Sequence, residues 1–391
     1  MAHAAASKLP AGTSHGEAIE ADSGGVAKVV AVMLGVAIGV LIPIAVWLAV
    51  SAHEARDDAR AAVAQAEPAP SAMSRDAASD AGALPTASFA GMAPANAAEI
   101  AAAYEAVPAE LPALTPGPVV DVRLGIGHEV VQIAPGVSYQ AWTFGNGAPG
   151  PAIHVREGQQ VRVTLTNESP MPHSVDFHAA RIAPNAAFVD VAPGESFTFT
   201  FTAEDPGVYM YHCGTKPVLA HIANGMYGAI VVEPAAGTLP KADRQYVLVS
   251  SEWYLNGPGL DEPAGLDMVK AHNMTPDWVT WNGYAGQYAA HPLTALPGET
   301  VRFWVVAAGP SLDTDFHVVG TLLNRAWVNQ DMTQFQRNVQ TATVAAGGGG
   351  VFDVEIDEPG LYPVVSHSFA SVDLGQVGLL QVGDVSGSMS H

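Results

Sequence analysis

An internal repeat constrains the fold of this 391-residue chain more than any other feature. Three short segments recur in the same order at similar offsets, which indicates two copies of one structural unit. We place the copies at residues 117–236 and 240–384. The matched segments are 158–163 with 298–303, Asp176-Phe177-His178 with Asp315-Phe316-His317, and 206–209 with 359–362.

Both copies have the alternation of β-structure. Val161, Val163 and Leu165 are separated by polar residues, and Phe197, Phe199 and Phe201 are each separated by threonine. Such period-2 patterns, bounded by Pro-Gly turns, are typical of strands with one face in a core. The sequence therefore predicts an all-β fold of two antiparallel sandwiches.

The residues before the repeat differ in character. Residues 1–28 form a short polar tail, and residues 29–50 contain no charge. If residues 29–50 form a helix, it would be about 33 Å long, enough to span the hydrocarbon core of a bilayer, which is about 30 Å thick. We expect a transmembrane anchor, although residues 49–52 (Ala-Val-Ser-Ala) leave a cleaved signal peptide open.

Residues 51–116 are rich in Ala and Pro. We expect a flexible, disordered linker with short helices at 54–66 and 97–105. A flexible coil of this length would have a mean reach of about 45 Å, enough to hold a globular head clear of a bilayer.

Charge and cysteine content exclude several function classes. The net charge of −22 disfavours a nucleic-acid partner, which requires a basic face. A single cysteine excludes an intramolecular disulfide and a Cys-rich zinc or iron–sulfur site. That cysteine, with 14 His and 11 Met, leaves room for a soft-metal site that uses one thiolate.

One loop concentrates the ligands for such a site. Cys213, His221 and Met226 are spaced by eight and five residues between two expected strands. With a further His, best sought in residues 171–178, they supply two imidazoles, a thiolate and a thioether, the ligand set of a blue-copper electron-transfer site. Each residue alone is more often a buried packing residue, but their combination on one loop favours metal binding.

Side-chain alternation predicts a second site. His212 and Cys213 are adjacent and must face opposite sides of an extended strand, as must His173 and His178, which are five apart. Asp176 and His178 share a face. One side thus offers His173 and Cys213, and the other offers Asp176, His178 and His212. A third imidazole for the second site would come from the second copy, which offers His317 and His367.

These motifs resemble the copper-containing nitrite reductases, enzymes of two Greek-key cupredoxin domains, over residues from about 115 to 384. The resemblance implies a type 1 copper bound by His173, Cys213, His221 and Met226. It implies a type 2 copper bound by His178, His212 and His367. The matching stretches are 173–178, 211–213, 221–230, 316–320, 338–341, His367 and 375–378.

The same resemblance implies the remaining roles. His367 would come from a neighbouring subunit of a homotrimer, Asp176 and His317 would handle protons, and Val319 would line the substrate pocket. The reaction would be one-electron reduction of nitrite to nitric oxide, with electrons from a cupredoxin, a cytochrome or a membrane carrier. The copper supply this requires fits an extracytoplasmic head on the membrane tether.

Three alternatives differ in their requirements. A laccase-type multicopper oxidase needs about eight His in His-X-His pairs, and this chain has no such pair. A membrane-tethered type 1 copper electron-transfer or copper-storage protein needs only the first ligand set. A purely structural sandwich would bind no copper.

Overall fold

The computed structural model describes residues 87–328 and 332–385. The expected polar tail, the membrane anchor and the helix at 54–66 lie outside these residues. In the described ranges, no helix combines the length and apolar character needed to cross a membrane.

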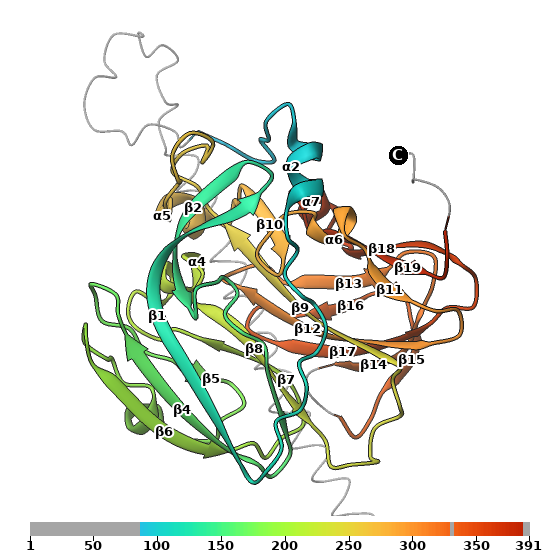
Figure 1. Ribbon diagram of the computed structural model, residues 1–391, viewed down its shortest axis with the longest axis horizontal. Coiled ribbons are helices and arrows are strands. Elements are labelled where there is room, and N and C mark those ends of the chain that lie inside the picture. The colour runs from blue at the N-terminus through green and yellow to red at the C-terminus, as the bar shows by residue number, and fades with distance from the viewer. Residues whose placement is uncertain (1–86, 329–331, 386–391) are drawn as a thin grey trace, which may run out of the picture. The chain divides into compact units, whose positions relative to one another are not determined.

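The first copy of the repeat forms two four-stranded sheets (Figure 1). Short helices α3 (Pro184–Ala187) and α4 (Val218–Ala223) lie in its loops. One sheet has the order β2 (Val137–Phe144), β1 (Val119–Ala134), β4 (Gln160–Asn167), β6 (Ser196–Thr202). The other has the order β3 (Ile153–Arg156), β8 (Tyr227–Glu233), β7 (Gly207–His212), β5 (Asp176–Phe177).

The second copy forms a six-stranded and a five-stranded sheet. The larger has the order β10 (Trp278–Trp281), β9 (Arg244–Trp253), β12 (Thr300–Gly309), β17 (Gly349–Glu355), β14 (Leu323–Val328), β15 (Gln336–Val339). The smaller has the order β11 (Leu293–Ala295), β19 (Val377–Val382), β18 (Gly360–Ser366), β13 (Thr314–Val318), β16 (Ala342–Val344). Its helices are α5 (Met268–Asn273), α6 (Gln287–Ala290) and α7 (Phe369–Asp373).

The two copies of the repeat pair their strands in the same way. β4 in the first copy and β12 in the second each lie between a parallel and an antiparallel neighbour. The antiparallel pair β5–β7 of the first copy corresponds to the antiparallel pair β13–β18 of the second. The prediction of a mainly β protein is confirmed, but the prediction of purely antiparallel sandwiches is wrong. Among the strands of the described ranges, four pairs are parallel: β1–β4, β3–β8, β9–β12 and β11–β19. Alternating burial reports which face of a strand is buried, not the direction of its neighbour.

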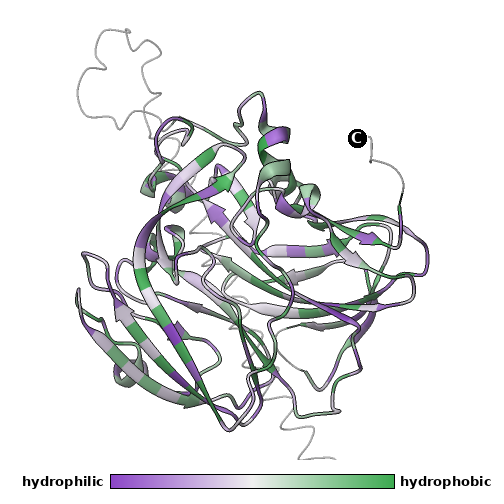
Figure 2. Ribbon diagram, in the orientation of Figure 1, coloured by the Kyte–Doolittle hydropathy of each residue, from purple (hydrophilic) through white to green (hydrophobic). Residues whose placement is uncertain are grey.

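Burial follows the alternation where a strand has one face in a core. Val161, Val163 and Leu165 of β4 are buried while their neighbours are more exposed. Figure 2 colours the residues by hydropathy and shows hydrophilic and hydrophobic bands along the strands. β12 departs from this pattern because both of its faces are covered. Trp304 and Val306 on its second face pack with residues of β7 and β8, which joins the two sandwiches through a shared apolar layer.

The prediction of a flexible linker is wrong for residues 87–116, which form an ordered segment against the sandwiches. Helix α2 (Ala97–Ala103), close to the expected 97–105, contacts α6. Beyond it, the Leu111 N–H donates to the Gln245 carbonyl and the Val247 N–H donates to the Ala109 carbonyl. These bonds form an isolated antiparallel bridge between Glu110 and Tyr246 of β9, which a composition rich in Ala and Pro did not indicate.

A buried ion pair fastens the start of this segment. The Lys270 ammonium lies 2.8 Å from both carboxylate oxygens of Asp277, and the two side chains are 5% and 2% exposed. The Asp277 carboxylate also accepts from the Phe89 and Leu255 N–H groups, and the ammonium lies 4.5 Å from the centre of the Phe89 ring. Every polar atom of the pair is therefore compensated inside the protein.

We expect Lys270→Met to lower the free energy of unfolding by about 3–5 kcal/mol, because it leaves the Asp277 carboxylate buried without its cation. Urea unfolding measures the change. Lys241→Met is the control, since Lys241 pairs with Asp243 while 85% exposed and its loss should change little. Equal effects of the two substitutions would contradict the role given to burial.

Candidate metal centres

His212, the last residue of β7, and Cys213, which follows it, face different environments. Val208, Met210 and His212 share the face that meets the second sandwich, while Tyr211 and Cys213 point into the core of the first. β5 pairs with β7 in matching register, so Asp176 lies opposite His212 and Phe177 lies opposite Tyr211. The structure thus sorts the predicted residues onto two sides of one strand pair.

On the core side, His173, Cys213 and His221 bring their donor atoms within 4.8 Å of one another. The Cys213 Sγ atom lies 3.2 Å from His221 Nδ1 and 3.8 Å from His173 Nδ1, and these two nitrogens are 3.0 Å apart. All three side chains have no exposed surface. His221 comes from α4, and His173 is held by a backbone bridge to Val191.

Met226 closes this loop. Its carbonyl accepts from the Cys213 N–H at 3.1 Å, and its side chain is fully buried in the same apolar core as Cys213. The Ser174 N–H points at the Cys213 sulfur from 3.4 Å. The Ser174 hydroxyl also accepts from the Gly214 N–H and the Thr215 hydroxyl, so the segment just before β5 and the loop after the cysteine are tied together.

Burial keeps the imidazoles of this cluster neutral. Desolvation, with the neighbouring His221 and His128, lowers the pKa of His173 to about 3. Desolvation also lowers the pKa of His221. Neutral imidazoles can act as metal ligands without first losing a proton near pH 7.

On the opposite side, Asp176, His178 and His212 form a second cluster. The His178 and His212 Nε2 atoms are 3.0 Å apart, and Asp176 Oδ2 lies 4.0 Å from His212 Nε2. His178 Nδ1 lies 3.0 Å from the Gly347 carbonyl and His212 Nδ1 lies 2.9 Å from the Cys213 carbonyl. A carbonyl accepts only from N–H, so both rings carry the proton on Nδ1 and point bare Nε2 atoms at the same place.

Electrostatics favour the neutral form of His212 as well. Desolvation is the main cause that lowers the pKa of His212, and His178 adds to it, while the Cys213 carbonyl and Asp176 oppose the shift. Since Gly347 belongs to the turn before β17, the second sandwich directly orients a donor of the first.

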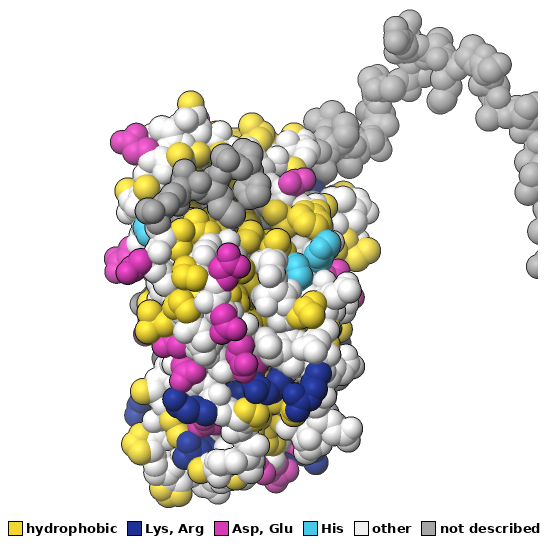
Figure 3. Space-filling view, turned by 90° about the vertical axis from the view of Figure 1, so that its right-hand side faces the viewer, with side chains coloured by type: hydrophobic (Ala, Val, Ile, Leu, Met, Phe, Trp, Pro, Cys, Tyr) yellow, Lys and Arg dark blue, Asp and Glu magenta, His cyan; other side chains and the backbone are white. Residues whose placement is uncertain are grey.

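The two predicted residues of the second copy form a separate pair. The ring centres of His317 and His367 are 5.3 Å apart, on β13 and just after β18. His317 Nδ1 donates to the Gln340 carbonyl at 2.6 Å, which leaves its Nε2 free to accept. Within the described part of one chain, the cluster at His178 and His212 includes Asp176 but not His367. In Figure 3 histidine side chains lie beside an apolar area on this side of the molecule.

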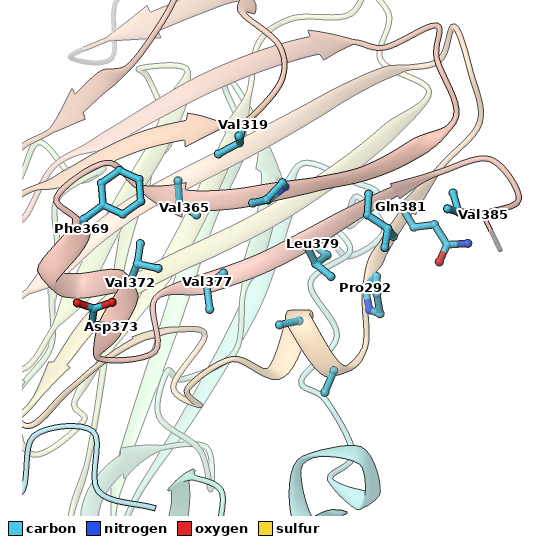
Figure 4. A pocket seen from close by; sticks show the side chains of 14 residues that line it. Pro292, Val319, Val365, Phe369, Val372, Asp373, Val377, Leu379, Gln381 and Val385 are labelled. Carbon is cyan, nitrogen blue, oxygen red and sulfur yellow. The ribbon is translucent and has the colours of Figure 1, made fainter. Parts of the chain in front are cut away.

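Val319 lines a cavity of about 930 Å³ on the outer face of the second sandwich. Figure 4 shows Val319, Val365 and Phe369 around one end of it, with Leu379 and Pro292 towards the other. Val319 is 37% exposed and Phe369 is 54% exposed, so large apolar side chains face solvent here.

Known proteins are similar to this chain in sequence. A family model described as multicopper oxidase matches residues 126–237. A copper-containing nitrite reductase of Neisseria gonorrhoeae is 41% identical over 269 residues, which cover 67% of this chain and 68% of that protein. One from Pseudomonas chlororaphis is 30% identical over 68% of this chain and 79% of its own length. The chain belongs to the copper-containing nitrite reductase family.

Solved structures agree with this membership. A copper nitrite reductase of Nitrosomonas europaea aligns with a TM-score of 0.63 at 34% identity, over 68% of this chain and 94% of that chain. One from Thermus scotoductus also has a TM-score of 0.63, at 27% identity, over 68% of this chain and 62% of that chain. These neighbours confirm two-domain cupredoxin-like architecture.

The donor atoms suit the copper that this family uses. The first cluster offers two imidazole nitrogens and a thiolate in an apolar core, the donors of blue-copper sites. The second offers imidazoles with fixed tautomers in a more open position, which suits a metal that binds substrate.

Sequence reasoning missed several residues around the clusters. His128 and Trp142 cover the first cluster from outside, and they are directly opposite each other in the β1–β2 register. Only that register reveals them, because neither lies in a motif. Gly347 lies in a run of glycines whose contact with His178 depends on how the sandwiches pack.

We expect Gly347→Ala to reduce the copper content of the second cluster several-fold and to leave the first unchanged. Gly347 has φ of +76°, so an alanine would strain the turn and displace the carbonyl that holds His178. Metal analysis with electron paramagnetic resonance measures both sites. Gly194→Ala is a matched control, with φ of +81° in a turn whose added Cβ meets nothing. Equal copper loss in both variants would contradict the role of Gly347.

Proposed function

We propose that the protein reduces nitrite to nitric oxide, with NO₂⁻, one electron and two protons giving NO and H₂O. The observation that carries this proposal is the pair of donor clusters on opposite faces of one strand, in a member of this family. One cluster is built to receive an electron, and the other can hold an anion beside proton donors.

For the first cluster, we assign His173, Cys213, His221 and Met226 as type 1 copper ligands. Their burial and the Ser174 N–H at the sulfur are the features that tune such sites. Cys213 and His212 are consecutive residues, and His212 Nδ1 donates to the Cys213 carbonyl at 2.9 Å. The bonds between Sγ of one and Nε2 of the other form a short path for the electron.

For the second cluster, we assign His178 and His212 of one subunit and His367 of a neighbouring subunit as type 2 ligands. Within one chain His367 lies with His317 rather than with the convergent Nε2 atoms. Type 2 copper bound there would act as a Lewis acid on the nitrite oxygens.

Proton delivery falls to groups beside the substrate position. Asp176 lies within 4.0 Å of His212 Nε2, close enough for its carboxyl to donate to a nitrite oxygen near that atom. His317 would arrive with His367, and its Nδ1–H to Gln340 holds the ring while Nε2 carries the transferred proton. Val319, two residues after His317, would line the apolar side of the pocket.

The exposed apolar side chains on the outer face of the second sandwich support the proposal of a homotrimer. Exposed Val319 and Phe369 border the cavity beside the His317–His367 region, and a neighbouring subunit would remove them from water. A heterologous interface that closes into a ring of three gives every subunit the same contacts.

We further infer that residues 29–50 anchor the protein in a membrane, with the sandwiches on the extracytoplasmic side. The uncharged run in the sequence supports this inference. The electron donor would be a cupredoxin, a cytochrome or a membrane carrier. Retention of the full chain in membranes after alkaline carbonate washing tests the anchor, and release into the wash would contradict it.

We expect Asp176→Asn to keep both coppers but to lower nitrite-dependent nitric oxide formation at least tenfold, because an amide cannot deliver the carboxyl proton. Electron paramagnetic resonance spectra recorded with and without nitrite show whether both coppers are present and whether nitrite binds. Two copper signals in the wild type, one shifted by nitrite, are expected. Unchanged turnover in the variant would contradict the role of Asp176, and absence of nitric oxide formation by wild type would contradict the function.

Subunit mixing tests the source of His367. We expect homogeneous His367→Ala and His178→Ala trimers to be inactive, while mixed trimers recover about one-third of wild-type activity. Any ring containing both subunits has one junction at which an intact His178 meets an intact His367. No recovery in purified mixed trimers would place His367 and His178 in the same subunit's site.

A further inference from the structure

The first cluster has an outer wall made by the β1–β2 hairpin. The His128 and Trp142 rings stack with centres 5.3 Å apart and an 11° interplanar angle. Trp142 presents its ring at steep angles to His173 and His221, with centres 5.6 and 4.9 Å away. Both wall residues are half-buried, whereas the rings behind them are fully buried.

The orientation of His173 determines which of its nitrogens meets this wall. Its Nδ1 faces the interior, 3.0 Å from His221 Nδ1 and 3.8 Å from the Cys213 sulfur. Its Nε2 faces outward and lies 3.4 Å from His128 Nε2. A neutral imidazole carries one proton, so a His173 that offers Nδ1 to a metal must carry the proton on Nε2.

We propose that His128 is a positioning residue for the first cluster, accepting a hydrogen bond from His173 Nε2–H and thereby fixing its ring. The stack on Trp142 holds the His128 ring in place, and Trp142 limits rotation of His173. His128 then carries its own proton on Nδ1.

This arrangement has a consequence for copper chemistry. An acceptor on the far nitrogen of a ligating histidine raises the basicity of the ligand, and loss of such a partner typically weakens metal binding about 10–100-fold. A more basic ligand favours copper(II) over copper(I). The inference rests on the proposed assignment of His173 as a type 1 copper ligand.

The test compares His128→Leu with His128→Gln in the full chain. We expect His128→Leu to weaken copper(II) retention by the blue site about tenfold and to raise its reduction potential. A tenfold loss of preference for copper(II) over copper(I) corresponds to about 59 mV for one electron. We expect His128→Gln to restore most of both values, because the amide oxygen can accept from His173 Nε2–H.

His291→Leu is the control, since His291 contacts the Ala101 carbonyl and belongs to the second sandwich. It should leave the blue site unchanged. A wild-type potential in His128→Leu, or equal shifts in the Leu and Gln variants, would overturn the inference. If the wild-type protein loaded with copper has no blue thiolate absorption, the type 1 copper assignment itself fails. This result is distinct from a failure of the role proposed for His128.

Discussion

The structure depends on the alternation of side chains along β7 at the boundary between two apolar layers. Cys213 turns into the core of the first sandwich, where its sulfur is fully buried. His212, one residue earlier, turns towards the layer that joins the sandwiches. Peptide geometry alone separates the two donors while keeping them covalently adjacent. A one-residue shift in the pairing of β7 would exchange the two environments and dismantle both clusters.

The two copies of the repeat have diverged around this constraint. The first copy keeps both donor clusters, whereas the second has no cysteine and presents the His317–His367 pair on its outer side. The second copy also contributes from within the chain, since the Gly347 carbonyl holds the tautomer of His178. Trp304 and Val306 pack against β7 and β8, and this packing holds the Gly347 carbonyl at a fixed position beside His178. The inter-sandwich layer therefore serves the metal site as well as stability.

Three of the four imidazoles of the clusters have their remaining nitrogen near a defined neighbour, and the exception is the buried Nε2 of His221. His178 and His212 donate to carbonyls, and His173 meets His128 through its outer nitrogen. Such neighbours decide which nitrogen is available to a metal, so they matter as much as the donors themselves. The N-terminal segment contributes differently, through an isolated backbone bridge to β9 at Tyr246 and through Phe89, which contacts the buried Asp277–Lys270 pair.

Sequence alone determined the repeat, the mainly β fold and the division of donors between two faces, because these follow from local periodicity and residue chemistry. Cys213, His212, Asp176 and His178 could be grouped from spacing and parity. The mixed strand directions, the ordered segment at 87–116, and the approach of Gly347 and His128 to the clusters were decided only by tertiary structure. They depend on which distant strands become neighbours, and side-chain alternation carries no information about that choice.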